Sequence, residues 1–169
     1  MNRNITVNIL RFLGFILLQA LIVNQITLHQ FINPYVYPMF ILLLPFETPI
    51  WLVMTLGFSL GLGIDIFSQS MGIHAAATTF MAFLRPYVIK LLSPIGGYET
   101  EDKPHIANQG LVWYLSYATI LILGHHTFLI ILEYLSLAHL GFELLKVVSS
   151  SVVSLILIVL IEYTLSSKR

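Results

Sequence analysis

The chain of 169 residues contains no cysteine, and only 9% of its residues are charged. Without cysteine the protein has no disulfide, no thiol nucleophile and no thiolate ligand for a metal. A soluble domain carries about a quarter charged residues, so this chain has too few charges to cover a water-facing surface. Eight acidic and eight basic residues give a net charge of zero, which provides no electrostatic reason to expect a nucleic-acid partner.

Hydrophobic residues make up 57% of the chain, and the mean hydropathy is +0.89. Such a chain places most of its surface in lipid, where only helices and closed barrels satisfy every backbone hydrogen bond. The apolar runs are continuous, whereas a lipid-facing strand alternates apolar and polar residues. The sequence therefore predicts an all-α, polytopic membrane protein. We expect residues 1–169 to form one transmembrane domain, a compact bundle of about six helices with one short or kinked helix.

A helix needs about 20 residues to cross the hydrocarbon core of a bilayer. The predicted spans are 9–28, 34–45, 50–67, 73–92, 111–134 and 144–165. The basic leader before the first run resembles a signal sequence, but no small-residue cleavage site follows it cleanly. We therefore expect this segment to be retained as the first span.

The second predicted span is the irregular one. Asn33 and Pro34 are typical of a helix start, with Asn33 as the N-cap and Pro34 at the first helical position. Pro38 predicts a kink in the second turn, and Pro45 predicts the end of the helix. About 12 helical residues extend only about 18 Å. The segment is thus either a tilted span in a locally thinned bilayer or a re-entrant helix.

The basic residues indicate the orientation of the bundle. With six spans, Lys146 alone falls toward the non-cytoplasmic side. Cytoplasmic loops carry an excess of Lys and Arg, so we expect both termini in the cytoplasm. The basic residues on or near that side are Arg3, Arg11, Arg85, Lys90, Lys103, Lys168 and Arg169.

Asp65 is the most unusual residue of the third predicted span. A carboxylate inside a span costs up to about 3 kcal/mol on insertion scales, and less near the interface, so it suggests a purpose. His74 lies across the following turn and is a candidate partner. Asp65 and His74 are therefore candidate intramembrane polar or partner-contact residues. The alternative is an interfacial Asp65 that is solvated or caps the turn with Ser68.

Small residues on the third and fourth predicted spans indicate a close helix contact. Gly57 and Gly61 form a small-xxx-small pattern that lets another helix approach, and Gly63 lies beside them. Ala75 and Ala76 begin a stretch of small residues on the next span. The pattern predicts helix packing of this hairpin on itself or on a partner protein.

Arg85 and Glu47 complete the candidate polar residues. By antiparallel register, Arg85 lies about 15 Å from Asp65 along the helix axis, too far for a natural salt bridge. Glu47 lies in the turn between Pro45 and Pro49, and Arg85 could reach it by extending toward the interface. An Arg85–Glu47 ion pair is one hypothesis for this site.

We identify no catalytic, cofactor-binding or metal-binding residues in the sequence. His125, His126 and Glu133 form the one set that resembles a metal site, but adjacent histidines on a helix point about 100° apart. No HExxH spacing is present either. Interhelical hydrogen bonds and an interfacial carboxylate are the preferred interpretation.

Two further polar sets belong to the first and last predicted spans. Serines in a membrane helix favour helix–helix contact over nucleophilic chemistry. Amides in a span either bond neighbouring helices or line a cavity. The residues are Ser149, Ser150, Ser151 and Ser154, and Gln19, Asn24 and Gln25.

Four motifs carry a family resemblance. They are Asn33-Pro34-Tyr35, LLLPFETP at 42–49, GLGIDIFSQSMGIHAAATTFMAFLRP at 61–86 and KLLSP at 90–94. Together they resemble the MreD family, the small integral membrane proteins of bacterial rod-shape determination, in the form found in Bacteroidetes. The length, number of spans and loop position also fit, so the resemblance covers nearly the whole chain.

The resemblance implies a non-enzymatic membrane scaffold of the cell-elongation (peptidoglycan synthesis) complex in the bacterial inner membrane. Such proteins bind the bitopic protein MreC, and thereby help to link MreB filaments to the RodA glycosyltransferase and a class B penicillin-binding protein. The family is also similar in fold to the substrate-binding subunits of energy-coupling-factor vitamin transporters. The alternative function is therefore a small-molecule carrier, with Asp65, His74 and either Gln19 or Glu133 around a pocket on the non-cytoplasmic face. A membrane enzyme using His125, His126 and Glu133 is a distant third.

Overall fold

The structure, a computed structural model, describes residues 2–26, 32–99, 102–134 and 140–166. The regular elements of this described part are all helices, which confirms the predicted all-α membrane bundle. They are α1 (Asn2–Leu21), η1 (Val23–Gln25), α2 (Met39–Leu42), α3 (Ile50–Ser68), α4 (Ile73–Leu91), α5 (Ile106–Gln109), α6 (Leu111–Tyr134) and α7 (Leu140–Ser166).

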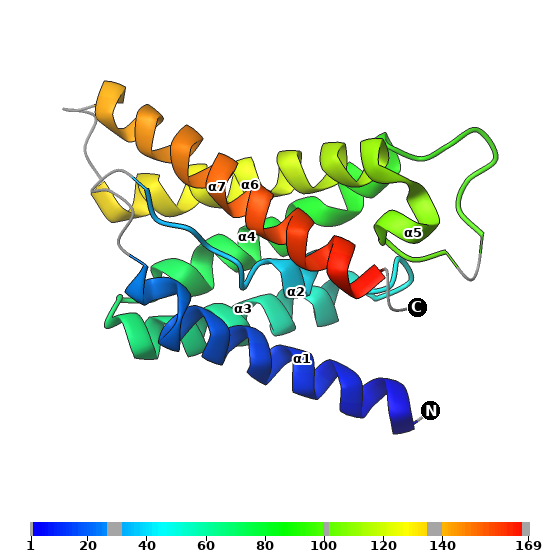
Figure 1. The fold of residues 1–169 in the computed structure, drawn as a ribbon, viewed down its shortest axis with the longest axis horizontal. Helices are drawn as coiled ribbons and strands as arrows, with labels where there is room; N and C mark the ends of the chain where they lie inside the picture. The colour runs from blue at the N-terminus through cyan, green and yellow to red at the C-terminus, as the bar shows by residue number, and fades with distance from the viewer. Residues whose placement is uncertain (1, 27–31, 100–101, 135–139, 167–169) are drawn as a thin grey trace.

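The long helices run side by side along the longest axis of the molecule (Figure 1). The start of α1 and the end of α7 lie at the same end of the bundle, which we call the termini end, and the α3–α4 turn lies at the far end. Four described helical segments are long and apolar enough to cross a membrane: Thr6–Gln25, Ile50–Ser68, Leu111–Tyr134 and Gly141–Leu165. The more polar α4 lies between α3 and α6 and contacts both.

Most helix boundaries agree with the predicted spans. The helices α3, α4 and α6 begin and end within one residue of the spans 50–67, 73–92 and 111–134. The last helix begins at Leu140 rather than at residue 144. Residues 27 and 28 of the first predicted span lie outside the described residues, as do Lys168, Arg169 and the side chain of Arg3.

The second predicted span is not a helix over 34–45, and this prediction was wrong. Residues 33–36 have no helical structure, and the only α-helix in this stretch is the single turn of α2. Pro38, with φ of −60°, is the N-cap of α2 rather than a kink inside a helix. Proline disfavours the helical conformation at the residue before it, which removes both Asn33 and Tyr37 from a continuous helix.

We call residues 32–45 the crossing segment. It runs between the other elements from the far end toward the termini end (Figure 1). An extended residue advances about 3.3 Å and a helical residue only 1.5 Å, so partial extension lets a short segment pass through the bundle. The segment is also the centre of the core, because Tyr37, Met39, Ile41 and Leu42 have no exposed surface.

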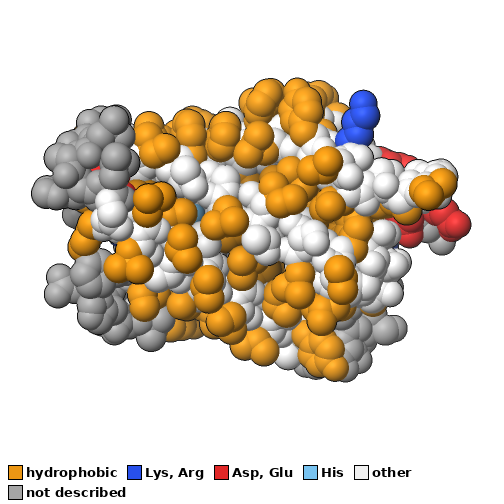
Figure 2. Space-filling model, turned by 90° about the horizontal axis from the view of Figure 1, so that it is seen from above, with side chains coloured by type: hydrophobic (Ala, Val, Ile, Leu, Met, Phe, Trp, Pro, Cys, Tyr) orange, Lys and Arg blue, Asp and Glu red, His pale blue; other side chains and the backbone are white. Residues whose placement is uncertain are grey.

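Apolar side chains cover the outside of the bundle. Large hydrophobic residues of α1, α3 and α7 are more than half exposed, among them Leu10, Trp51 and Ile156. In the space-filling view, hydrophobic side chains extend along the visible face, and the Asp, Glu, Lys and Arg side chains that are drawn gather mainly at one end (Figure 2). A surface of this kind is typical of a protein that faces lipid.

The α3–α4 hairpin packs on itself. A Cβ atom at Gly61 would lie 2.6 Å from the Ala75 backbone nitrogen, and one at Gly57 would lie 3.0 Å from the Thr78 carbonyl oxygen. These two glycines therefore let the helices touch backbone to backbone. Gly63 instead faces α1, where its Cβ would lie 2.8 Å from Ile16. Ala75 is buried and Ala76 is half-buried.

Candidate functional site

The backbone of the crossing segment is held at the far end by Gln19 of α1. The Gln19 Oε1 atom accepts a hydrogen bond from the Val36 N–H at 2.7 Å, and its Nε2 atom donates to the Pro34 carbonyl at 3.0 Å. Gln19 has no exposed surface. A non-helical backbone at membrane depth needs such partners, because lipid offers none. This amide, predicted only as a helix contact or cavity residue, thus replaces the hydrogen bonds that a helix would have made.

Two serines of α7 hold the same stretch from the other side. The Ser150 hydroxyl accepts from the Asn33 N–H at 3.0 Å, and the Ser154 hydroxyl accepts from the Tyr35 N–H at 2.8 Å. Both serines are buried. The sequence predicted a helix-packing role for the serine cluster. The structure adds that the hydroxyls of Ser150 and Ser154 bind the backbone of the crossing segment.

A buried polar cluster surrounds the side chain of Tyr37. Its hydroxyl lies 3.0 Å from His74 Nδ1 and 2.8 Å from His125 Nε2, so it can donate to one imidazole and accept from the other. His126 Nε2 in turn lies 3.2 Å from the Ser154 hydroxyl, which links α6 to α7. The aromatic ring of Tyr35 packs at an angle against His74, His125 and His126.

The three buried histidines do not form a metal site. No group of three or more His, Cys, Asp or Glu residues among the described residues could hold a metal ion. Glu133, the third residue of the metal-like set, pairs instead with Lys146 of α7 at 2.9 Å. The contacts of these residues are interhelical hydrogen bonds and an ion pair, which is the arrangement that the sequence favoured.

Asp65 caps the following helix. Its Oδ1 atom accepts from the His74 N–H at 3.1 Å and from the Ser70 hydroxyl at 2.6 Å, and its Oδ2 atom accepts from the Ala75 N–H at 2.9 Å. His74, the predicted candidate partner, meets Asp65 through its backbone N–H, while its ring bonds Tyr37. The suggested Ser68 cap is replaced by Ser70. A carboxylate at a helix N-terminus satisfies free N–H groups and complements the helix dipole, which explains why Asp65 is buried.

Arg85 of α4 holds the termini half of the crossing segment. Its Nη2 atom donates to the carbonyl oxygens of Leu44 and Pro45, and its Nε atom donates to the Tyr117 hydroxyl at 2.8 Å. The Tyr117 hydroxyl donates to the Leu42 carbonyl at 3.2 Å. The Leu42 and Leu44 carbonyls need side-chain donors because α2 ends after one turn, and Tyr117 and Arg85 supply them. The Pro45 carbonyl accepts from Thr48 as well.

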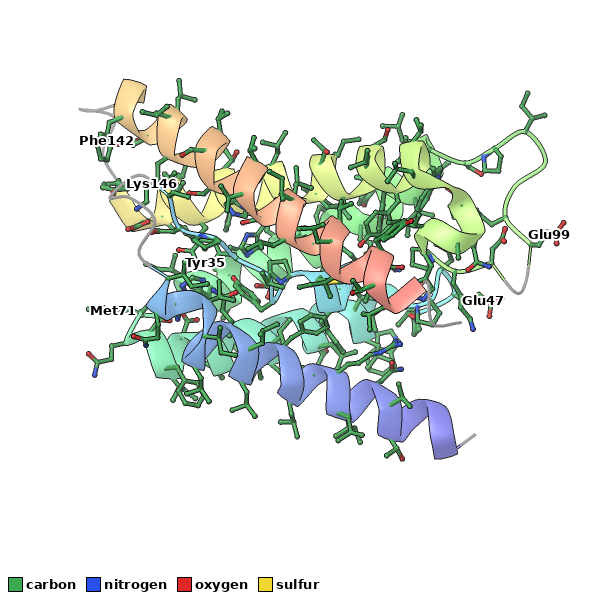
Figure 3. All side chains as sticks on the ribbon, in the orientation of Figure 1. Tyr35, Glu47, Met71, Glu99, Phe142 and Lys146 are labelled. Carbon is green, nitrogen blue, oxygen red and sulfur yellow. The ribbon has the colours of Figure 1, made fainter. Side chains whose placement is uncertain are left out.

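The hypothesised Arg85–Glu47 ion pair is absent. No carboxylate among the described residues lies within 4 Å of Arg85, and Glu47 is exposed. The side-chain view places Glu47 at the termini end of the molecule, with Glu99 of the hydrophilic loop that connects α4 with α5 (Figure 3). Glu47 follows the turn at Pro45, where solvation is available, whereas Arg85 lies deeper and meets backbone carbonyls first.

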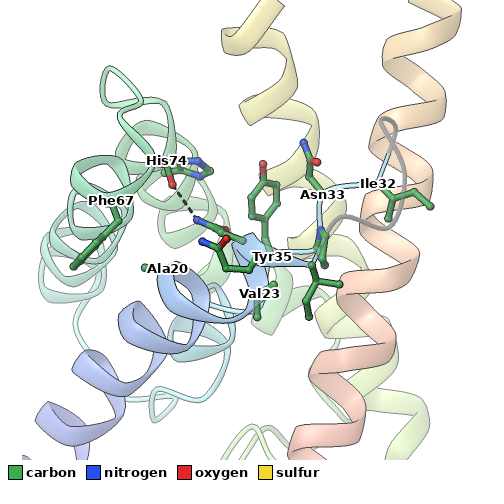
Figure 4. Close-up of a pocket in the computed structure, with 12 residues that line it drawn as sticks. Ala20, Val23, Ile32, Asn33, Tyr35, Phe67 and His74 are labelled. Atoms are coloured by element: carbon green, nitrogen blue, oxygen red, sulfur yellow. Dashed lines mark hydrogen bonds between the residues drawn. The ribbon is translucent and has the colours of Figure 1, made fainter.

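A polar cavity of about 400 Å³ opens at the far end beside the crossing segment. The close-up shows His74 and Phe67 on one side of it and Asn33 and Ile32 on the other (Figure 4). Asn24 and Gln25 also line it, as the sequence suggested, and Asn24 donates to the Ser68 hydroxyl at 3.2 Å. Because His74 lines the cavity and bonds Tyr37, the cavity connects to the buried polar cluster.

Sequence reasoning missed three functional positions. Tyr37 and Tyr117 were not singled out, although a tyrosine in an apolar span needs a partner for its hydroxyl. Glu162 of α7 is buried and lies 2.8 Å from His105 Nδ1, in the loop before α5. A glutamate inside the last predicted span, three residues before its end, was the available signal for this pair.

No family model, curated protein or solved structure matches this chain.

Proposed function

We propose that this protein is a non-enzymatic scaffold of the bacterial cell-elongation complex, in the inner membrane, with MreC as its direct partner. Through MreC it would connect MreB filaments with RodA and a class B penicillin-binding protein. Both termini would lie in the cytoplasm, because the basic residues gather at the termini end. The proposal starts from the four motifs that resemble the MreD family.

One observation carries the proposal: the 61–86 motif contacts the crossing segment, which contains the first motif and the start of the second. The segment contains the whole first motif and the first four residues of the second. Arg85, near the end of the 61–86 motif, binds Leu44 and Pro45 of the second. His74, from the same long motif, binds Tyr37 beside the first. Motifs that meet around one unusual backbone favour a shared fold over a chance likeness.

The use of the polar groups favours a structural role over an enzymatic one. Asp65 accepts three hydrogen bonds from its own chain, and His125 bonds Tyr37. A general acid or base needs geometric access to a substrate proton. These groups instead support backbone and neighbouring helices, as a rigid interaction scaffold requires.

The glycines of the hairpin are not the docking surface for a partner. Gly57 and Gly61 already face α4 of the same chain, so their substitution would act through the fold. The apolar faces of α1, α3 and α7 remain for the transmembrane helix of a bitopic partner. Leu13, Phe58 and Ile156 are each about half exposed and report on these three faces.

The test is co-purification and site-specific cross-linking with MreC from native membranes. A photo-reactive amino acid at position 13, 58 or 156 should cross-link MreC from one helix face and not from the others. An unrelated bitopic protein expressed at the same level is the control. Depletion of the protein should also turn rod-shaped cells round. The proposal loses its support if MreC neither co-purifies nor cross-links from any face, and if depleted cells keep their shape.

The far-end cavity supports a second candidate function, the small-molecule carrier. It offers amide, hydroxyl and imidazole groups from Asn24, Asn33, Tyr35, Ser68 and His74. Thermal stabilisation by a vitamin-sized ligand, lost in Asn24→Leu, would favour this function. Asn24 is the better test residue than Asp65, because Asp65 supports α4 directly. An unchanged melting temperature across a broad ligand library would count against it.

A further inference from the structure

The positive charge of Arg85 is buried, and no carboxylate of the described residues forms an ion pair with it. The side chain is only 2% exposed, and its acceptors are two carbonyl oxygens and one hydroxyl. A guanidinium has five N–H donors, and these bonds use the Nε donor and those of Nη2. The two donors on Nη1 have no acceptor among the described residues. A buried, uncompensated cation with free donors favours an anionic ligand.

A cavity of about 220 Å³ lies at this cation, where the start of α3 meets the end of α4. Arg85 and Lys90 both line it, and so do Ser93 and Thr48. Lys90 is exposed and has no ion-pair partner among the described residues. The Thr48 hydroxyl donates to Pro45, which leaves its oxygen as an acceptor. Two basic residues and one serine therefore line the same small volume.

No acidic residue of the described part of the chain lines this cavity. Glu47 is the nearest along the chain, but it is exposed and does not line the cavity, although Phe46 and Thr48 do. Asp102 of the hydrophilic loop accepts a hydrogen bond from the Glu99 backbone N–H. The local balance of charge in the cavity is thus positive.

The remaining wall of the cavity is apolar and lies near the end of α4. Phe46, Ile50, Val53 and Ile89 line it beside the cations. Arg85 lies six residues before the end of α4, about 9 Å from it along the axis. A guanidinium at that depth can reach the level of lipid headgroups.

Two aromatic residues contact the end of α4. Tyr98 donates to the Ile89 carbonyl, and Trp113 donates to the Leu92 carbonyl at the end of α4. Burial raises the pKa of Tyr98, which keeps this phenol protonated as a donor. Tyr and Trp gather at the headgroup level of membrane proteins.

We propose that this cavity binds the phosphate of an anionic phospholipid, with Arg85 Nη1 and Lys90 as its ligands and the apolar wall against the acyl chains. Inorganic phosphate shares the anionic chemistry but would leave the apolar wall unused, so the lipid is the favoured occupant. Basic pockets between helices on the cytoplasmic side are suited to anionic headgroups. This site does not depend on the proposed role in cell elongation.

The test measures the thermal stability of the full chain in a neutral detergent. Short-chain phosphatidylglycerol should raise the melting temperature in a saturable manner, and native mass spectrometry should show one retained lipid. Phosphatidylcholine with the same acyl chains should have little effect at the same concentration. Equal stabilisation by both lipids would overturn the proposal. Equal stabilisation by inorganic phosphate would overturn the lipid assignment.

Lys90→Gln tests the site without disturbing the core. One Lys near an anionic headgroup contributes an interaction that corresponds to about a fivefold change in affinity, so phosphatidylglycerol should bind Lys90→Gln about fivefold more weakly. Lys90→Arg should restore binding. Lys103→Gln is the matched control, because Lys103 is exposed and does not line this cavity. The proposal fails if Lys90→Gln binds like the wild type or if Lys103→Gln weakens binding equally.

Discussion

The two halves of the crossing segment satisfy their non-helical backbone groups with different side chains. The far half, residues 32–38, is held by the neutral groups of Gln19, Ser150 and Ser154. The termini half, residues 39–45, is held by the cation of Arg85. Both satisfy backbone groups that lie away from water and outside a regular helix.

The two halves differ in the charge and the hydrogen-bond donors that remain once the backbone groups are satisfied. A neutral amide or hydroxyl adds no charge to the bundle once its bonds are made. The guanidinium satisfies the carbonyls but brings a full charge and two further donors into the interior. The far half thus adds no charge to the polar cavity beside it, whereas the termini half presents a cation for an anionic ligand. Stability and anion binding should therefore separate along the segment.

Arg85→Met should have the largest effect on stability. It leaves the Leu44 carbonyl without its donor and removes the Nε donor from the Tyr117 hydroxyl, and each unsatisfied group costs about 1–3 kcal/mol, so we expect a loss of about 3–4 kcal/mol. Unfolding by denaturing detergent measures it. Lys90→Met removes a cation from the exposed part of the same helix and should change stability by less than about 0.5 kcal/mol. Equal effects of the two would contradict a structural role for Arg85.

Gly61→Ala should have the next largest effect, because it disturbs the contact of α3 with α4. Helix α4 carries His74 and Arg85, which contact the two halves of the crossing segment. The new methyl group would meet the backbone of His74 and Ala75, and overpacking of this kind costs about 2–3 kcal/mol. Gly14→Ala in α1 is the control, since a Cβ there meets nothing within 4 Å. It should be neutral or stabilise the protein by up to about 1 kcal/mol. A neutral Gly61→Ala would show that the hairpin is looser than described.

Gln19→Leu isolates the far half of the segment. It keeps the approximate volume but leaves the Val36 N–H and the Pro34 carbonyl without their partner, at about 2 kcal/mol. Lipid binding at Arg85 should be unchanged in this variant, which is the sharpest test of the separation. Gln25→Leu, at an exposed amide nearby, should have little effect on stability. A loss of phosphatidylglycerol binding in Gln19→Leu would show that the halves act as one.

Ser154→Ala should have the smallest of these effects. It removes one acceptor from Tyr35 N–H and a contact with His126, for an expected loss of about 1 kcal/mol. Ser59→Ala is the comparison, because the exposed Ser59 hydroxyl bonds a carbonyl of its own helix. Thermal unfolding of the two variants side by side should show a lower melting temperature only for Ser154→Ala. A lower melting temperature for Ser59→Ala than for Ser154→Ala would argue against the role of α7 in holding the crossing segment.

The sequence was sufficient for the parts of the fold that depend on local pattern. Continuous apolar runs identified α3, α4 and α6, and the spacing of Gly57 and Gly61 indicated the close hairpin. The crossing segment was beyond local reasoning, because Asn33-Pro34 suits a helix start as well as an extended chain. What decides between them lies elsewhere: Gln19 upstream, and Ser150 and Ser154 far downstream.

The candidate site shows the same limit. Asp65 and Arg85 stood out because charges are rare at this depth, but their partners could not be read from residue types. Asp65 binds backbone N–H groups, and Arg85 binds backbone carbonyls. A sequence suggests pairs of opposite side chains, as in the Arg85–Glu47 hypothesis. It does not show which backbone groups lack a partner, because the backbone is the same at every residue. Only the ends of α2 and α4 in space show where free backbone groups occur.

The backbone conformation of Val36 tests the central claim most directly. Carbon-13 chemical shifts of Val36 in lipid nanodiscs, with Val53 of α3 as the helical reference, report this conformation. The structure places Val36 outside any helix, so its Cα and Cβ shifts should lack the helical displacement that Val53 shows. Helical shifts at Val36, equal in sign to those of Val53, would contradict the non-helical crossing segment. They would favour the short helix that the sequence alone suggested.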